Sequence, residues 1–311
     1  MATPEPLSVP RWMDLWSDLE TRLSVMLLRP RAQTGFVASI ESLLDQLTEQ
    51  LDADADSCLY WLFQVATSSA VGYSTSHATI CASLCHLAAP GLGIAAAQRR
   101  SLTLAALTMN LAMSQLQDTL VEQHGQPTPE QRKLIDVHPE WGALALVELG
   151  VSDPDWLQTV RRHHDQVAGL DLLTRVLAAT DRYAALLSPR ETRPGRCVTD
   201  SARGVIARSG TGVDEVGHAL LSAVGICPPG TFVRLEDQRV AVVLRRSQDG
   251  EHLWVAPVLD AEGLPIVEAR LLHTGIEGAA IEAALVTQTV RVRMNHARML
   301  ELSREAARTV A

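Results

Sequence analysis

The spacing of apolar side chains predicts that the chain begins with helices. Leucines recur at four-residue intervals at Leu15, Leu19, Leu23 and Leu27. A second apolar stripe covers residues 40–51. Side chains spaced by three or four residues lie on one face of an α-helix. We therefore expect amphipathic helices over residues 10–51, followed by a short acidic break at residues 52–56.

Residues 58–224 continue the helical pattern with clear interruptions. Proline and glycine break it at residues 90–91, 125–129, 150–154 and 188–195. Thr128 precedes a proline, and Gln131 lies three residues further on, which is the arrangement of a capping box. We therefore expect a helix to begin at this point.

After residue 227 the pattern changes to short runs rich in β-branched residues. Residues 231–235, 239–246 and 252–259 are such runs, separated by turn residues, and they predict a small antiparallel β-unit. Residues 276–285 and 295–307 again favour helices, with Asn295 as an N-cap. The predicted organisation is an N-terminal helical segment (1–57), a helical domain (58–226), a β-unit (227–275) and a C-terminal helical segment (276–311).

Composition narrows the class of protein. Hydrophobic residues make up 47%, charged residues 20% and aromatic residues 4% of the chain, as in a globular helical protein. A net charge of −9 argues against a surface for DNA or RNA. The chain has five cysteines, no stretch with the pattern of a signal peptide, and no apolar run long enough to span a membrane. We therefore expect a cytoplasmic protein.

Histidine and aspartate residues follow a fixed order through the helical domain. A histidine follows Tyr-Ser-Thr-Ser, another begins a His-Pro-x-x-Gly unit, two more form a doublet before an acidic residue, and an aspartate lies in an Ala-x-Asp-x-Tyr-x-Ala-Leu unit. These residues are His77, His138, His163, His164 and Asp181. The ordered set resembles the HD superfamily of metal-dependent phosphohydrolases, and within it the HD-GYP branch, whose members hydrolyse cyclic di-GMP. The resemblance covers about residues 73–193.

The resemblance implies an HD-type helical domain and makes these five residues candidate metal ligands. Imidazole and carboxylate ligands suit Fe, Mn or Zn. Two such ions about 3.5–4 Å apart clamp a phosphodiester and supply hydroxide. The resemblance also places Arg190 and Arg193 at an arginine-bearing turn, where they are candidates for phosphate binding, the alternative being surface ion pairs.

The sequence departs from the family where the chemistry is most demanding. Met109 and Asn110 replace the His-Asp doublet that names the family, Met113 replaces its lysine, and only Gly169 remains of its glycine-rich loop. Two dications 3.5 Å apart repel by on the order of 20 kcal/mol at an effective dielectric of 20, so they need a bridging anion. Asn110 is neutral, and we therefore expect no intact catalytic residues and no two-metal centre.

Other residues leave alternatives open. The retained histidines and Asp181 are expected to form a hydrogen-bonded polar cluster without a cofactor, the alternative being one divalent ion of Fe, Mn or Zn. Cys81 and Cys85 share a helical face with His77 and form either a packed seam, which we prefer, or a soft metal site. Asp118 is either a helix-end acid, which we prefer, or a replacement for the lost carboxylate.

The predicted function is that of a degenerate HD-GYP-like signalling or regulatory protein that does not hydrolyse cyclic di-GMP. It would act by binding a signalling protein or a cyclic dinucleotide, as the non-catalytic HDOD branch of the superfamily suggests by resemblance. The alternative is an active metal-dependent phosphodiesterase with an altered ligand set. Self-association is compatible with either function.

Overall fold

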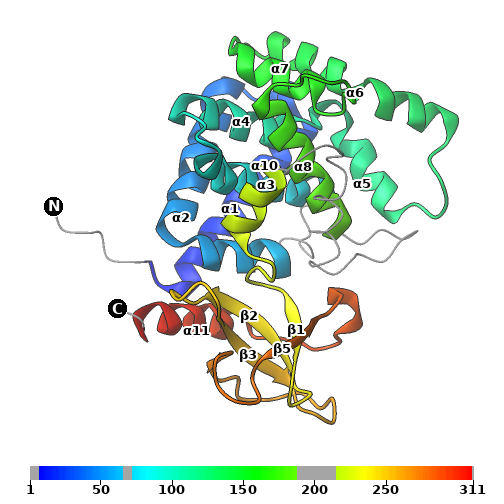
Figure 1. Cartoon of the computed structure of the whole chain (residues 1–311). Coiled ribbons are helices and arrows are strands. Elements are labelled where there is room, and N and C mark those ends of the chain that lie inside the picture. The colour runs from blue at the N-terminus through cyan, green and yellow to red at the C-terminus, as the bar shows by residue number, and fades with distance from the viewer. Residues whose placement is uncertain (1–6, 66–71, 188–214, 310–311) are drawn as a thin grey trace.

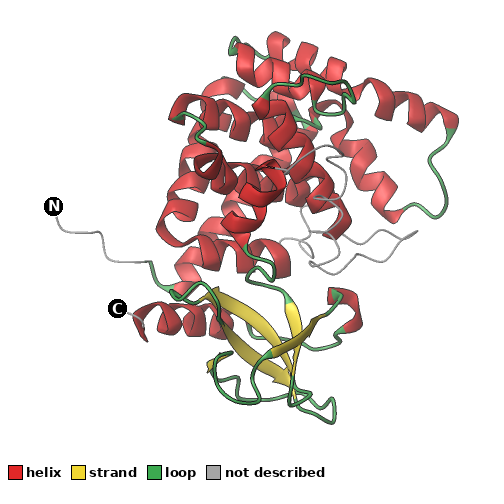
Figure 2. Ribbon diagram, in the orientation of Figure 1, coloured by secondary structure: helices red, strands yellow, loops and turns green. Residues whose placement is uncertain are grey.

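The computed structural model describes residues 7–65, 72–187 and 215–309. Helices form one part of the molecule, and a small antiparallel sheet lies beside them at the C-terminal end (Figures 1 and 2). The mainly α fold with a C-terminal β-unit is therefore confirmed. In the described residues, every helix is too short or too polar to cross a bilayer.

The N-terminal helices are α1 (Val9–Leu28) and α2 (Phe36–Gln64). Their apolar stripes are buried, as the leucine spacing predicts. The acidic break is a kink inside α2, where Asp54 leaves helical geometry at φ −156° and ψ 79°. Its carboxylate accepts hydrogen bonds from the Ser57 backbone N–H at 3.2 Å and from the Ser57 hydroxyl at 2.7 Å. Asp54 therefore caps the second half of the helix.

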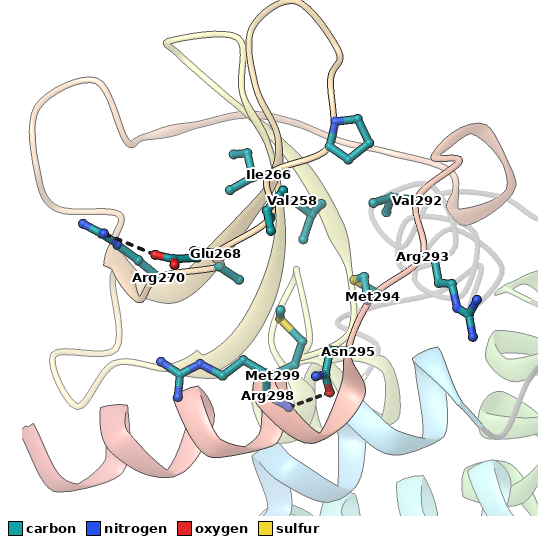
Figure 3. A pocket seen from close by; sticks show the side chains of 13 residues that line it. Val258, Ile266, Glu268, Arg270, Val292, Arg293, Met294, Asn295, Arg298 and Met299 are labelled. Carbon is teal, nitrogen blue, oxygen red and sulfur yellow. Dashed lines mark hydrogen bonds and ion pairs between the residues drawn. The ribbon is translucent and has the colours of Figure 1, made fainter.

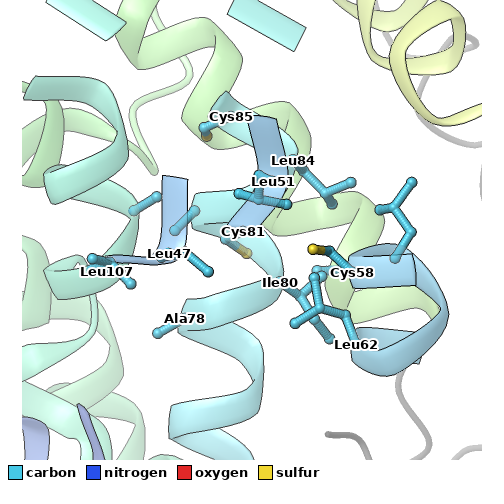
Figure 4. Close-up of a cluster of buried hydrophobic side chains, with 14 of the residues drawn as sticks. Leu47, Leu51, Cys58, Leu62, Ala78, Ile80, Cys81, Leu84, Cys85 and Leu107 are labelled. Atoms are coloured by element: carbon cyan, nitrogen blue, oxygen red, sulfur yellow. The ribbon is translucent and has the colours of Figure 1, made fainter. Parts of the chain in front are cut away.

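The central helices surround α3. They are α3 (Tyr73–Ala88), α4 (Ala96–Thr108), α5 (Ser114–Glu122), α6 (Pro129–Glu148), α7 (Pro154–Arg162), α8 (Leu172–Leu187) and α10 (Glu215–Val224), with short 3₁₀ turns at Ala89–Leu92 and Leu111–Met113. The predicted capping box at Thr128 and Gln131 is present. Figure 4 shows Cys81 and Cys85 packed among apolar side chains of α2 and α3, which favours the packed seam over a soft metal site for Cys85.

The sheet has the strand order β4-β3-β2-β1-β5. Its strands are β1 (Phe232–Leu235), β2 (Val240–Arg246), β3 (Leu253–Leu259), β4 (Leu272–His273) and β5 (Ile281–Ala284), and a 3₁₀ turn follows at Thr287–Thr289. The first three strands lie where the sequence predicts them. Helix α11 (His296–Thr309) closes the chain, and Asn295 caps it by accepting from the Arg298 N–H at 3.1 Å.

The predicted helix at residues 276–285 is wrong. These residues contain β5, which pairs with β1 in the register Val233 with Ala284, and the Leu285 N–H donates to the Phe232 carbonyl at 2.8 Å. The alanine-rich composition favours a helix, but the free edge of β1 offers ladder hydrogen bonds that a local helix cannot supply. Tertiary pairing therefore overrides local propensity here, and the C-terminal helical segment is shorter than predicted.

Two arginines of β2 attach the sheet to the kink in α2. The Arg245 guanidinium lies 2.6 Å from both carboxylate oxygens of Asp54. Arg246 donates from Nε to Asp56 at 2.7 Å and from its backbone N–H to the same carboxylate at 3.0 Å. The acidic break is thus both a change of direction in α2 and the point at which the β-unit docks.

Candidate functional site

A cavity of about 160 Å³ lies where α3, α5, α6 and α8 meet, and it contains most of the predicted site residues. Those that line it are His77, Asn110, Met113, His138, His164 and Asp181. His163 lies immediately behind, with its ring centroid 5.2 Å from that of His138 and 4.1 Å from that of His164. The structure therefore brings together all five candidate ligands, which come from four separate segments.

His138 is oriented by the proline that follows it. Pro139 lies inside α6 and has no N–H, so the helix cannot satisfy the Ile135 carbonyl four residues earlier. The His138 Nδ1 lies 2.6 Å from that carbonyl oxygen. Because a carbonyl only accepts, Nδ1 carries the hydrogen and Nε2 keeps a lone pair. The His-Pro pair therefore fixes both the tautomer and the direction of the imidazole.

His163 is oriented in the same way by the end of a helix. It is the C-cap of α7, whose last carbonyls lack helical donors. Its Nδ1 donates to the Val160 carbonyl at 2.7 Å, which leaves a lone pair on Nε2. The two Nε2 atoms of His138 and His163 lie 3.3 Å apart. Two neutral imidazoles held in this way direct lone pairs at each other, and neither can donate a hydrogen bond.

Burial keeps both imidazoles neutral. Desolvation lowers the pKa of His138 to about 4, although its bond to the Ile135 carbonyl opposes the shift. Desolvation and the charge of His164 lower the pKa of His163 to about 3. A shared proton therefore does not hold the two Nε2 atoms together near neutral pH. A metal cation fits this position, because it accepts lone pairs from both nitrogens. One nitrogen from each of His138, His163 and His164 lies within 4.8 Å of the others.

A second group of side chains lies on the α3 side of the cavity. The His77 Nε2 is 2.8 Å from the Asp181 carboxylate, and the Cys81 sulfur is 3.6 Å from the same nitrogen. The Tyr73 ring stacks on His77 with centroids 5.4 Å apart. Burial opposes ionisation of Asp181, but the hydrogen bond and charge of His77 hold the pKa of that carboxyl well below its usual value. Asp181 is thus an ionised carboxylate already engaged by His77.

The residues that replace the family's doublet do not restore a two-metal site. Asn110 and Met113 line the cavity, whereas the Met109 side chain is 1% exposed and belongs to the hydrophobic core. Asp181 is the one carboxylate among the residues that line this cavity. Its single negative charge does not offset two dications at bridging distance. The donor set therefore fits one metal ion at the histidines and does not fit a bridged pair.

The remaining sequence candidates lie elsewhere. Asp118 accepts from the Ser74 backbone N–H at 2.6 Å and from the Ser74 hydroxyl at 3.1 Å, so it caps the helix that carries His77. It lies inside α5 and not at the end of its own helix. Arg161 and Arg162 form exposed ion pairs with Glu140 and Asp165. Arg190 and Arg193 lie outside the described residues.

The sequence analysis did not predict two polar features of the structure. Gln117 lines the cavity from α5, and only its helical spacing from Asn110 and Met113 hinted at this position. Asp249, His252 and His273 form an exposed group on the β-unit that no local motif marks, because β3 separates the two histidines. A larger cavity of about 580 Å³ between α11 and the loop after β3 contains none of the predicted residues (Figure 3).

No family model matches the sequence. The cyclic di-GMP phosphodiesterase PA4108 of Pseudomonas aeruginosa is 28% identical in an alignment 158 residues long, which covers 47% of this chain and 38% of that protein. The solved structure of Bd1817, a HDG"Y"P protein from Bdellovibrio bacteriovorus, matches with a TM-score of 0.52 and 16% identity, over 71% of this chain and 73% of that one. The chain is thus similar in sequence to less than half of a cyclic di-GMP phosphodiesterase, and its helical fold is similar to that of an HD-GYP protein.

Proposed function

We propose that this chain is a regulatory HD-GYP-like protein that binds one divalent metal ion at His138, His163 and His164, does not hydrolyse cyclic di-GMP, and acts through a protein partner. The observation that supports the metal is the pair of Nε2 atoms 3.3 Å apart, both with lone pairs fixed by carbonyl-bound Nδ1 atoms. Neutral imidazole is a good ligand for Zn, Fe or Mn. Carbonyl bonds of this kind also orient metal-binding histidines in other proteins.

The absence of hydrolysis follows from the charges around the cavity. A bound divalent ion polarises phosphoryl oxygens and lowers the pKa of a bound water. Asn110 provides an amide where a bridging carboxylate is needed for a second ion. Asp181 accepts a hydrogen bond from His77 at 2.8 Å, and so His77 and Asp181 orient each other. These residues make one end of the cavity polar, but they do not provide ligands for a second ion beside the first.

The size of the cavity supports a protein partner. Sites that enclose small molecules usually have volumes of about 300–1,000 Å³. The cavity at the histidines has about 160 Å³, which suits an ion with its waters or a single phosphate group. A whole cyclic dinucleotide would remain mostly outside it. The likeness to a cyclic di-GMP phosphodiesterase nevertheless makes binding of that nucleotide, without turnover, the second candidate.

The test is metal content together with activity. The full chain is purified, loaded separately with Mn, Fe, Ni or Zn, and assayed on cyclic di-GMP and on a generic phosphodiester. We expect about one ion per chain, loss of that ion in His163→Ala, and no turnover. Two ions per chain with turnover abolished by His163→Ala would establish the active phosphodiesterase instead. A metal-free protein under all loadings would favour the hydrogen-bonded polar cluster.

A pair of isosteric variants tests the charge argument directly. Asn110→Asp and Gln117→Glu each add one carboxylate to the wall of the same cavity. Only Asn110 occupies the position of the bridging ligand in the resemblance, so we expect Asn110→Asp alone to raise the stoichiometry above one ion per chain. Equal stoichiometry in the two variants would show that the missing bridging charge is not what limits the site.

A further inference from the structure

A second group of possible metal ligands lies on the β-unit, on elements that contribute nothing to the cavity at the histidines of the helical domain. Asp249 lies in the turn between β2 and β3, His252 directly precedes β3, and His273 ends β4. One carboxylate oxygen and one nitrogen of each imidazole lie within 4.8 Å of one another. The two rings have centroids 5.3 Å apart and are tilted by 43°. The pairing of β4 with β3 thus brings together side chains that are distant in the sequence.

Asp249 fixes the orientation and the tautomer of His252. Its Oδ1 accepts the backbone N–H groups of Glu251 and His252, both at 2.9 Å, which holds the carboxylate in place. Its Oδ2 lies 2.8 Å from the His252 Nδ1. Hydrogen bonds from the backbone and the side chain of His252 hold the pKa of Asp249 well below its usual value, so the carboxylate is ionised and only accepts. Nδ1 therefore carries the hydrogen, and the lone pair of the His252 ring lies on Nε2.

The backbone of Gly275 fixes the tautomer of the other histidine. The Gly275 N–H donates to the His273 Nδ1 at 3.2 Å, so the lone pair of this ring lies on Nδ1. Nε2 then carries the hydrogen and donates to the Ser247 hydroxyl at 3.2 Å. The Trp254 ring packs against His273 edge to face with centroids 4.6 Å apart. His273 therefore offers one lone pair, in a direction that three neighbours determine.

Gly275 also leaves room between the two rings. A Cβ added to this glycine would lie 3.0 Å from the His273 Nδ1 and 3.2 Å from the His252 Cδ2, which is the carbon bonded to Nε2. The two nitrogens that carry lone pairs therefore border the same small space, which a side chain at residue 275 would fill. The 3.2 Å hydrogen bond from Gly275 is at the long end of the usual range, so a cation that binds Nδ1 displaces only a weak donor.

We propose that the His252 Nε2 and the His273 Nδ1 bind one zinc ion on the β-unit. Each imidazole gives its other N–H to an oxygen, as metal-binding histidines usually do, and these oxygens belong to Asp249 and Ser247. Two nitrogen ligands favour zinc over magnesium or calcium. Zinc is usually four-coordinate, and at this partly exposed position water or the Asp249 carboxylate completes the coordination. The site does not depend on the motifs of the helical domain.

Zinc at this position links a short edge strand to the neighbouring hairpin. β4 pairs with β3 through Trp254 with His273 and Val255 with Leu272. One ligand on β4 and one at the start of β3 add a connection across this short pairing. A ligand that binds the folded state alone stabilises it, so zinc should slow local opening of β4. We therefore expect slower hydrogen exchange at the Thr274 N–H, which donates to the Leu253 carbonyl at 2.9 Å.

The first test is calorimetric titration with zinc of the full chain carrying His163→Ala, which weakens the other proposed metal site. We expect about one zinc ion per chain, and loss of binding in His252→Gln and in His273→Gln. Asp249→Asn keeps an oxygen for the two backbone N–H groups but loses the charge that orients His252, so we expect about 10-fold weaker binding. His124→Gln, at an exposed histidine after α5, is the matched control and should bind as its parent does. Zinc binding that is unchanged in His252→Gln or in His273→Gln overturns the proposal.

A second test uses the unmodified chain and reports on each histidine separately. Diethyl pyrocarbonate reacts with imidazole nitrogens that carry a lone pair, and mass spectrometry locates the products. Zinc should protect His252 and His273 and leave the reaction at His124 unchanged. Gly275→Ala, whose methyl group fills the space between the rings, should abolish this protection, while circular dichroism checks that the variant is folded. Equal modification of His252 and His273 with and without zinc overturns the proposal, whatever the result at the histidines of the cavity.

Discussion

The two faces of α6 have the reverse of the usual composition. The buried residues of the inner face are a histidine, a proline, a glycine and an alanine, with Leu146 as the one large apolar residue among them. The outer face carries a tryptophan, two leucines and two valines. In an ordinary amphipathic helix the large apolar residues face the core and the small or polar ones face solvent. Each face of α6 therefore needs an explanation other than the burial of apolar surface in the monomer.

The inner face is built around the orientation of His138 and a close approach of neighbouring elements. Pro139 frees the carbonyl that fixes His138, and a side chain at Gly142 would reach the Met109 carbonyl and Val160 at 3.6 Å. A Cβ at this position would make ordinary van der Waals contact, and a larger side chain would meet the Met109 backbone. The outer face has no such restriction, since its large apolar side chains are 38–57% exposed.

The largest expected difference between the faces is in the free energy of unfolding when a leucine on each face is replaced by alanine. The two leucines lie two residues apart. Leu146 is fully buried and Leu144 is 50% exposed. Leu146→Ala should lower the free energy of unfolding by about 3 kcal/mol, because it removes buried apolar area and leaves a cavity. Leu144→Ala should change it by about 0.5 kcal/mol or less. Urea unfolding at concentrations low enough to keep the chain monomeric measures both. Similar losses of stability in the two variants would contradict this expectation, because they would show that both faces of α6 are packed in the folded chain.

Local patterns predicted most of the helices because their signals lie within a few residues. The capping box at Thr128, the cap at Asn295 and the acidic break before Ser57 each depend on side chains that contact backbone three residues away. The segment 276–285 was predicted wrongly because its strand is determined by β1, some fifty residues earlier in the chain. Propensity carries no information about such a partner.

The candidate site likewise has one part that the sequence predicts and another that depends on distant parts of the chain. The order of motifs selected five residues that the structure places close together, and their role as metal ligands stays a prediction. Sequence alone gave no access to the two carbonyls that fix the tautomers of His138 and His163, although the His-Pro pair supplied a hint. It also did not reveal that Met109 lies in the core while Asn110 and Met113 face the cavity, since this depends on where α4 ends.

The two buried histidines, His138 on the inner face of α6 and His163 at the end of α7, should make stability depend on pH. In the native state the pKa of His138 is about 4 and that of His163 about 3, against an ordinary value of 6.5 in the unfolded chain. Between pH 6.5 and 4 the unfolded state therefore takes up protons that the native state does not. The free energy of unfolding should fall as the pH is lowered through this window, by about 1.4 kcal/mol per pH unit for each histidine.

Urea unfolding of metal-free protein across this pH window provides the measurement. His163→Gln should reduce the pH dependence of the free energy of unfolding by the contribution of one histidine, since glutamine does not titrate. Met113→Leu, at the wall of the same cavity, adds and removes no titratable group and should keep the wild-type slope. A slope unaffected by His163→Gln would mean that the ring is not held neutral by burial.

The smallest expected loss of stability concerns the capping box at the start of α6. This capping box supports both faces of the helix equally. Thr128 accepts from the Gln131 N–H at 3.2 Å, and the Gln131 side chain accepts from the Thr128 N–H at 2.8 Å. Thr128→Ala should lower the free energy of unfolding by about 1 kcal/mol, because it leaves a helix N–H without its acceptor. Thr119→Ala on α5, which removes only a hydroxyl donated to the Gln115 carbonyl, is the control, with about 0.5 kcal/mol or less expected. Metal content should stay within a few-fold of wild type in Thr128→Ala. A selective loss of metal would instead show that the first turn of α6 helps to position His138.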